Sequence, residues 1–186
     1  MAEFNKSFFE RGMDIIPLVN QGDADTDITG DWVKLRDYDR VGVLLAKYGT
    51  EDVDDLGLQL LQGTTAAGGD SKALALPANS LVMTKTGTLT SQTVWTRTLA
   101  AAAIDGMAFG SSVPTGFTRV IADVNTNALL LYAEFEVQAA LDVDGGFDWF
   151  TVFVEGDNVN NACLLSVWAI LMGGRFPQAV PLSAIS

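Results

Sequence analysis

An acidic double-glycine turn between two long apolar runs constrains the fold more than any other part of the chain. The turn is Leu141-Asp142-Val143-Asp144-Gly145-Gly146-Phe147-Asp148-Trp149. Apolar residues dominate positions 129–137 before it and 147–154 after it. Two extended segments joined by a tight connection rich in glycine and aspartate are typical of β-structure. We therefore expect this turn to fix the register between two core strands.

Further apolar segments of strand length recur along the chain, separated by turn residues. Residues 41–48 are apolar at odd and even positions alike, which predicts a strand with both faces largely buried. Residues 81–86 and 93–99 predict a hairpin, with Gly87 between the two strands. The other predicted strands cover residues 32–35, 56–60, 117–124, 129–137, 147–155 and 162–172. Because helices and strands do not alternate, we expect an all-β fold, an antiparallel β-sandwich of about eight or nine strands.

A chain of 186 residues is expected to form one domain, and no linker divides it. We place an N-terminal arm at residues 1–20, a single β-sandwich domain at residues 21–172 and an extended C-terminal tail at residues 173–186. Both ends are too apolar to remain in water, so they are expected to contact a partner. The predicted contact residues are Phe4, Phe8, Phe9, Ile15, Ile16, Phe176, Pro177, Pro181 and Ile185.

Composition limits the classes of partner. Hydrophobic residues make up 48% of the chain and the mean hydropathy is +0.24, which indicates apolar surface left over for an oligomer or a larger assembly. The net charge of −12 argues against a nucleic-acid surface, because such surfaces neutralise phosphates with Lys and Arg. No apolar run approaches the roughly 18 to 20 residues that span a bilayer, so no membrane association is expected.

The residues that could carry chemistry are few. The chain has no histidine, which excludes histidine-based catalytic triads and histidine zinc sites. Asp142, Asp144 and Asp148 are weak candidates for a calcium loop, but no bidentate Glu follows at the required distance. Aspartate and glycine are also what a tight hairpin requires, and we favour that interpretation. We predict neither a metal nor a cofactor.

Two further patterns have simpler structural explanations. Residues 63–72 resemble a phosphate-binding loop, but Gly69 stands where the lysine of that motif is required. A flexible exposed loop is the expected structure. Glu134 and Glu136 are spaced to share one face of a strand, which also suggests a glycosidase carboxylate pair. We expect them to form the solvent-exposed face of an edge or outer strand. No enzyme activity is predicted.

Three stretches together resemble a known family. They are Asp37-Tyr38-Asp39-Arg40-Val41-Gly42-Val43-Leu44-Leu45, Leu141-Asp142-Val143-Asp144-Gly145-Gly146-Phe147-Asp148 and the ending Pro181-Leu182-Ser183-Ala184-Ile185. Their order and spacing resemble those of small structural proteins from tailed bacteriophages, several of which are capsid cement or decoration proteins. The resemblance covers most of the chain from about residue 14, and residues 63–116 match only loosely.

The resemblance implies a jelly-roll-like sandwich that binds the outside of an icosahedral shell and clamps neighbouring major capsid proteins. It also implies a homo-oligomer, a trimer near three-fold positions, located on the capsid exterior of the virion. Two alternatives remain open. One is a head-fibre or tail structural component, and the other is a carbohydrate-binding β-sandwich on the virion surface that uses Trp95 or Trp149 as a stacking platform.

Overall fold

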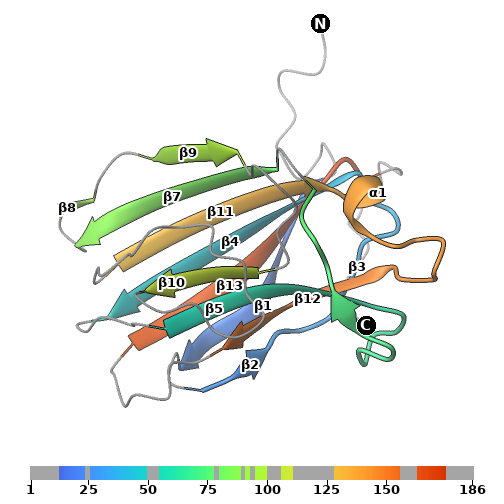
Figure 1. Cartoon of the computed structure of the whole chain (residues 1–186), viewed down its shortest axis with the longest axis horizontal. Coiled ribbons are helices and arrows are strands. Elements are labelled where there is room, and N and C mark those ends of the chain that lie inside the picture. Colours follow the sequence, from blue (N-terminus) through green and yellow to red (C-terminus); the bar gives the residue numbers. More distant parts are fainter. Residues whose placement is uncertain are drawn as a thin grey trace, which may run out of the picture.

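Two antiparallel β-sheets packed face to face make up the body of the molecule in the computed structural model (Figure 1). The structure describes residues 13–23, 26–49, 55–77, 80–88, 91–92, 95–99, 106–110, 128–155 and 163–174. This architecture confirms the predicted all-β sandwich. In the described part of the chain, no helix is both long enough and apolar enough to cross a membrane.

The larger sheet, sheet A, has the strand order β1-β13-β4-β11-β7-β8, with β9 also paired to β7. Its strands are β1 (Asp14–Asp23), β4 (Arg40–Gly49), β7 (Leu81–Thr88), β8 (Ser91–Gln92), β9 (Thr96–Leu99), β11 (Ala128–Glu136) and β13 (Cys163–Met172). Sheet B has the order β10-β5-β12-β2, with β3 also on β12 and β6 also on β5. Its strands are β2 (Ile28–Thr29), β3 (Val33–Lys34), β5 (Asp55–Gly63), β6 (Lys72–Ala73), β10 (Gly106–Gly110) and β12 (Trp149–Glu155).

The strand order is that of a jelly roll. If β2 and β3 count as one interrupted strand, the principal strands in chain order are β1, β2/β3, β4, β5, β10, β11, β12 and β13. Sheet A then reads first, eighth, third and sixth, and sheet B reads second, seventh, fourth and fifth. Two four-stranded sheets wound in this way form a jelly roll. Strands β7 to β9 are an insertion between the fourth and fifth strands, and they widen sheet A beyond β11.

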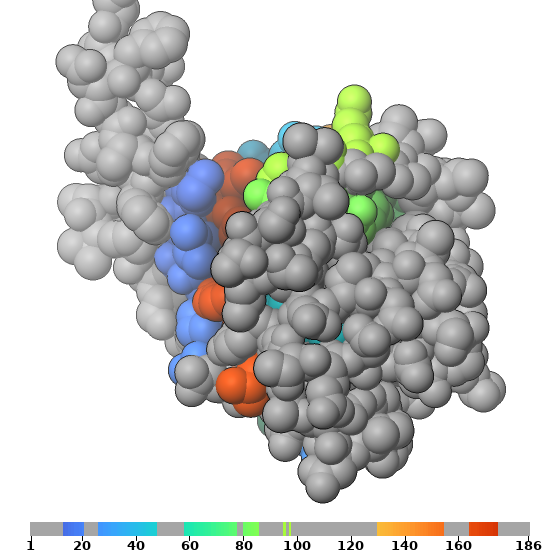
Figure 2. All heavy atoms as spheres, turned by 90° about the vertical axis from the view of Figure 1, so that its left-hand side faces the viewer, coloured from blue at the N-terminus to red at the C-terminus, as the bar shows by residue number. Residues whose placement is uncertain are grey.

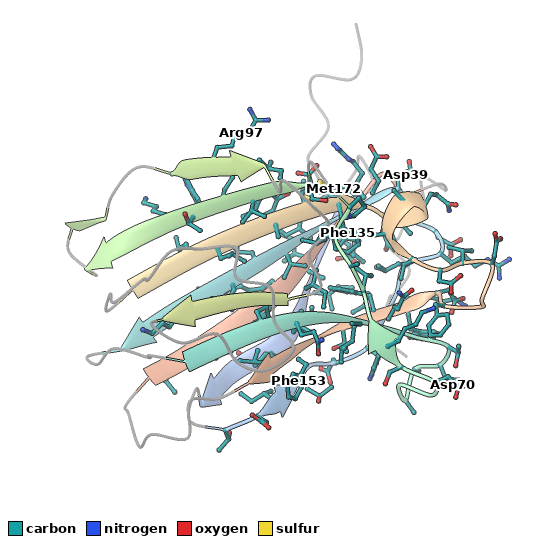
Figure 3. All side chains as sticks on the ribbon, in the orientation of Figure 1. Asp39, Asp70, Arg97, Phe135, Phe153 and Met172 are labelled. Atoms are coloured by element: carbon teal, nitrogen blue, oxygen red, sulfur yellow. The ribbon has the colours of Figure 1, made fainter. Side chains whose placement is uncertain are left out.

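The core lies between the two sheets, because alternate residues of each strand point inward. Phe135 of β11 and Phe150 of β12 meet across the interface, with ring centroids 5.6 Å apart at an interplanar angle of 60°. Phe135 is labelled between the layers in Figure 3. Fully buried aliphatic residues surround this pair, among them Val43, Leu45, Leu58, Leu60, Leu131, Val152, Leu165 and Val167.

A backbone hydrogen bond joins the two sheets along one long side of the sandwich. The backbone N–H of Asp31, between β2 and β3, donates to the carbonyl of Leu18 in β1. A β-carbon on the neighbouring Gly30 would lie 3.0 Å from the same carbonyl oxygen, so the two backbones are in close contact there. Strand β1 also carries register shifts on either side of Val19. These features block part of an edge that would otherwise be open to another strand.

Most predicted strands agree with the structure. The hairpin predicted from residues 81–86 and 93–99 is confirmed by the antiparallel pairing of β7 with β9, but Gly87, predicted to lie between the strands, is a paired residue of β7. The second half of the predicted N-terminal arm, from Asp14, is strand β1 of the sandwich. Most of the predicted tail and the strand predicted at residues 117–124 lie outside the described residues.

The double-glycine turn has a different role from the predicted one. Strand β11 before it belongs to sheet A and strand β12 after it belongs to sheet B. A four-residue helix, α1 (Val137–Ala140), precedes the turn and begins the crossing (Figure 1). The prediction that the turn sets the register of two paired strands is therefore wrong, because the turn connects the two layers.

Candidate interaction surface

The double-glycine turn is held by its own backbone and by one aspartate. The N–H groups of Gly145 and Phe147 both donate to the carbonyl of Asp142, each at 3.1 Å. The Asp142 carboxylate also accepts the Gly145 N–H through Oδ1 at 3.0 Å. Gly146 has a φ of +83°, a conformation that residues with a side chain rarely adopt.

Sheet B anchors this turn through two side chains. Lys72 of β6 lies 2.5 Å from Asp142 Oδ2, and its ammonium sits 4.0 Å from the ring centroid of Phe147. Gln62 of β5 accepts the backbone N–H of Asp142 at 2.9 Å. These contacts fasten the crossing segment to the layer that it enters.

The three aspartates proposed as weak calcium ligands do not converge. Asp142 is paired with Lys72, and Asp148 lies 3.8 Å from Lys34. Asp144 is exposed. Within the described residues there is no group of three or more acidic, histidine or cysteine side chains that could hold a metal ion.

The ion pair at the turn predicts a dependence of stability on pH. The pKa of Asp142 is lowered from its ordinary 3.8 by the hydrogen bond from Lys72 and then by that from the Gly145 N–H. A carboxyl group whose pKa is lower in the folded state stabilises the fold above the ordinary pKa and loses that contribution as the pH falls through the folded pKa. Lys72→Met is therefore expected to flatten the fall in urea midpoint as the pH drops below about 4. Lys85→Met, which removes a cation elsewhere, should leave the fall unchanged; equal flattening in both variants would contradict the assignment.

The loop at residues 63–72 is held by hydrogen bonds and by an aromatic ring. The Thr64 N–H and hydroxyl both donate to the carbonyl of Gly69, and the Gly69 N–H donates to Thr65 Oγ1. The ring of Trp32 packs against Gly63 and Gly68, where an added β-carbon would come within 2.7 Å of it. The sequence did not indicate these contacts, because the Trp32 side chain comes from another segment of the chain. Its lysine binds Asp142 and is not presented to a phosphate.

Glu134 and Glu136 share one cation on the outer face of sheet A. Arg40 Nη1 lies 2.9 Å from Glu134 and Nη2 lies 3.8 Å from Glu136. Tyr132 donates its hydroxyl to Glu134 at 2.9 Å. Burial and this hydrogen bond both raise the pKa of Tyr132 well above its ordinary value, so the phenol stays neutral. Two carboxylates that share one arginine form a structural cluster, in a strand paired on both sides and not at an edge.

A row of apolar residues crosses the outer face of sheet A. Successive strand pairings place Pro17, Trp168, Leu44, Tyr132 and Met83 side by side across five strands of sheet A. We call this row the apolar band. Its members are half-buried or exposed and point away from the core. The ring of Tyr132 lies over Gly42, where a β-carbon would come within 2.5 Å of it.

Apolar residues continue on both sides of the apolar band. Ile15 and Ile170 pair on one side, and Ala46 and Leu130 pair on the other. Ile15 is 45% exposed, and Leu164, further along β13, is 40% exposed. Figure 2 shows the blue residues of β1 beside the orange-red residues of β13 along one side of the molecule. Extended apolar surface of this kind marks an interaction site.

Sequence reasoning identified only part of this surface. Ile15, a predicted contact residue, is exposed at its margin, whereas Ile16 is buried in the core and is not available to a partner. The adjacent residues differ because neighbouring side chains of a strand point to opposite faces. The other predicted contact residues, Phe4, Phe8, Phe9, Phe176, Pro177, Pro181 and Ile185, lie outside the described part of the chain. The signal for the apolar band was the apolar character of residues 41–48 at both odd and even positions, which predicted burial of both faces.

The tryptophans proposed as stacking platforms differ in access. Trp149 is half-buried, and Lys34 lies over its ring at 5.8 Å from the centroid. Trp95 is 40% exposed, next to β9.

Comparisons with known proteins do not assign the chain to a family. No known family matches the sequence, and no curated protein matches it. Among solved structures, the SPBc2 prophage-derived protein YomS is similar, with a TM-score of 0.44 and 10% sequence identity, over 87% of this chain and 93% of that chain. The function is therefore argued from the surfaces described above and from the sequence.

Proposed function

We propose that this chain is a capsid cement protein of a tailed bacteriophage, a non-enzymatic component of the virion. It binds the outer surface of the icosahedral shell and stabilises contacts between neighbouring major capsid proteins. The observation that carries the proposal is the apolar band with its apolar flanks, which marks this chain as a component of a larger assembly. The sequence resemblance supplies the identity of the capsid partner.

The mechanism is stabilisation by binding. A protein that binds the assembled shell and not its separated subunits shifts the equilibrium toward the shell, by an amount that grows with its concentration. Rigid jelly-roll sheets suit this role, since little conformational freedom is lost when a pre-formed surface binds. The two carboxylates spaced like a glycosidase pair, Glu134 and Glu136, are paired with Arg40.

Shells that lack the protein provide the direct test. Adding the purified chain is expected to raise the temperature at which such shells release DNA, and the increase should saturate as binding sites fill. Acidic bovine serum albumin at the same concentration is the control for non-specific crowding. An unchanged release temperature together with no co-sedimentation with the shells would refute the proposal.

The strand boundaries show which terminal residues can be deleted without shortening a strand, so each predicted terminal contact can be tested by a deletion. Removing residues 1–12 leaves β1 complete, because that strand begins at Asp14. Removing residues 175–186 leaves β13 complete, because that strand ends at Met172. Either deletion is expected to weaken shell binding if the removed segment contacts the capsid. Undiminished binding by one variant would exclude that segment as a contact.

The two alternative functions predict different locations or ligands. A head-fibre or tail component would be labelled by antibody at vertices or on the tail, whereas a cement protein is labelled over the whole shell. A carbohydrate-binding function would rest on Trp95, which is exposed. In that case Trp95→Ala would abolish binding to a glycan and leave binding to the shell intact.

A further inference from the structure

We propose that the outer face of sheet A is the contact surface between copies of this chain. This inference deepens the proposed function, since it names the partner that covers the apolar band. The contact surface consists of the apolar band with Ile15, Ile170, Ala46, Leu130 and Leu164 around it. Three properties of the face favour a second copy: its charge, its area and the blocked state of the neighbouring edges.

The charge of the face permits self-association of an acidic chain. The whole chain has a net charge of −12, so most pairs of surfaces would bring carboxylates together. The described charged residues on this face are Arg40, Lys85, Arg97, Glu134 and Glu136. They carry three positive charges and two negative ones, and Asp23, in register with Leu164 at the margin, adds a third negative charge, so the face is neutral overall. Two copies can therefore meet here without the repulsion that their net charge imposes elsewhere.

Arg97 lies at the margin of the face, on β9 of the inserted hairpin. It is exposed, and Figure 3 shows it at the β9 edge of the molecule, pointing away from the body. It pairs in register with Met83, the last member of the apolar band. The insertion thus extends the apolar band by Met83 and places the positive charge of Arg97 at the rim of the face. Interface rims are usually polar.

The area of the face is sufficient for a specific contact. Five strands at about 4.8 Å spacing give a width of about 24 Å, and the outward residues of β13 span about 26 Å at about 3.3 Å per residue. The flat face therefore measures about 600 Å², and two such faces bury about 1,200 Å² in total. That value lies at the lower end of the range for specific protein interfaces. The calculation treats the face as flat and leaves out the additional surface of protruding side chains.

The strand edges next to this face are poor alternatives for joining two copies. Leu18 of β1 already accepts a backbone hydrogen bond from Asp31. The register shifts around Val19 further interrupt that edge. At the other side, β8 and β9 occupy the outer edge of β7, so the edge there consists of strands of only two and four residues, which are too short for extensive pairing with another copy. Association through the face leaves these pairings intact.

The mass of the full chain in solution tests the inference. We expect light scattering with size-exclusion chromatography to give a multiple of 19.8 kDa for the wild type. The double variant Ile15→Glu, Leu164→Glu places carboxylates at two exposed positions of the face and is expected to give 19.8 kDa. The matched control is Val143→Glu, an apolar-to-acidic change at a position 41% exposed in the double-glycine turn, away from the face. It should retain the wild-type mass.

Several outcomes would overturn the inference. They are a monomeric wild type at 100-fold dilution and at about 100 μM alike, a double variant with the wild-type mass, or dissociation of the Val143→Glu control. Far-ultraviolet circular dichroism checks that each variant is folded; if the double variant unfolds, the single variant Ile15→Glu, at the most exposed position, replaces it. A monomer that still stabilises shells would refute this inference alone. An oligomer that the double variant dissociates, with no effect on shells, would refute the proposed function alone.

Discussion

Replacing Phe150 by alanine is expected to lower the free energy of unfolding by about 3–5 kcal/mol, as measured by urea denaturation. The side chain is fully buried and its ring contacts Phe135 of the opposite sheet edge to face. Removing it leaves a cavity between the layers and deletes a contact that joins sheet A to sheet B. This is the largest effect that we expect from a single truncation, because such a cavity cannot collapse without moving a sheet.

Val143→Ala is the control for this prediction, since Val143 is exposed in the double-glycine turn. Its free energy of unfolding should change by less than about 0.5 kcal/mol. The reciprocal variant Phe135→Ala should cost a similar amount to Phe150→Ala. The double variant should then cost less than the sum of the two single changes, because the two rings are in contact. Strict additivity would show that the rings do not share one packing site.

Gly68→Ala is expected to destabilise the fold by about 2–4 kcal/mol, because two separate costs add at this position. Its φ of +73° lies in the left-handed region, which costs a residue with a β-carbon about 1–2 kcal/mol. The new methyl group would also lie 2.7 Å from the ring of Trp32. The Trp32 ring cannot move aside freely, because it also packs against Gly63. Urea midpoints at pH 7 measure the change.

Two other glycines separate these costs. Gly146 has a φ of +83° and no atom within 4 Å of an added β-carbon, so Gly146→Ala should show the backbone cost alone, about 1–2 kcal/mol. Gly42 has no positive φ, and the three atoms nearest to an added β-carbon all belong to Tyr132, so Gly42→Ala should show the steric cost alone. That steric cost should shrink when Tyr132 is already alanine. If Gly68→Ala were no worse than Gly146→Ala, the contact with Trp32 would carry no energy.

The strands could be predicted from the sequence because the alternation of apolar residues is local. The sheet to which each strand belongs could not be predicted, because pairing depends on distant partners. Strand β11 pairs with β4 and β7, whereas β12 pairs with β5. A glycine-rich turn between two apolar runs looks the same whether it joins paired strands or crosses between layers. For that reason the double-glycine turn was located correctly and given the wrong role.

The apolar band was missed for a related physical reason. A strand with apolar residues on both faces predicts burial of both faces within its own domain. In sheet A only one face is covered by sheet B, and the other carries Leu44 and Trp168 outward. A single-chain pattern does not distinguish burial by the same domain from burial by a partner. The order in residues 63–72 was missed similarly, because Trp32 reaches that loop from another part of the chain.

The pairing of β1 with β13 sets the order in which this protein can fold. The first strand of the sandwich finds its partner in the last, and β13 also separates β1 from β4. Sheet A therefore stays divided until the end of the chain has been synthesised, and long-range pairing of this kind folds slowly. Until then the unpaired edge of β4 and the apolar faces of sheet A are open to aggregation. A chain truncated before β13 should accumulate in inclusion bodies, even though most of its strands are present.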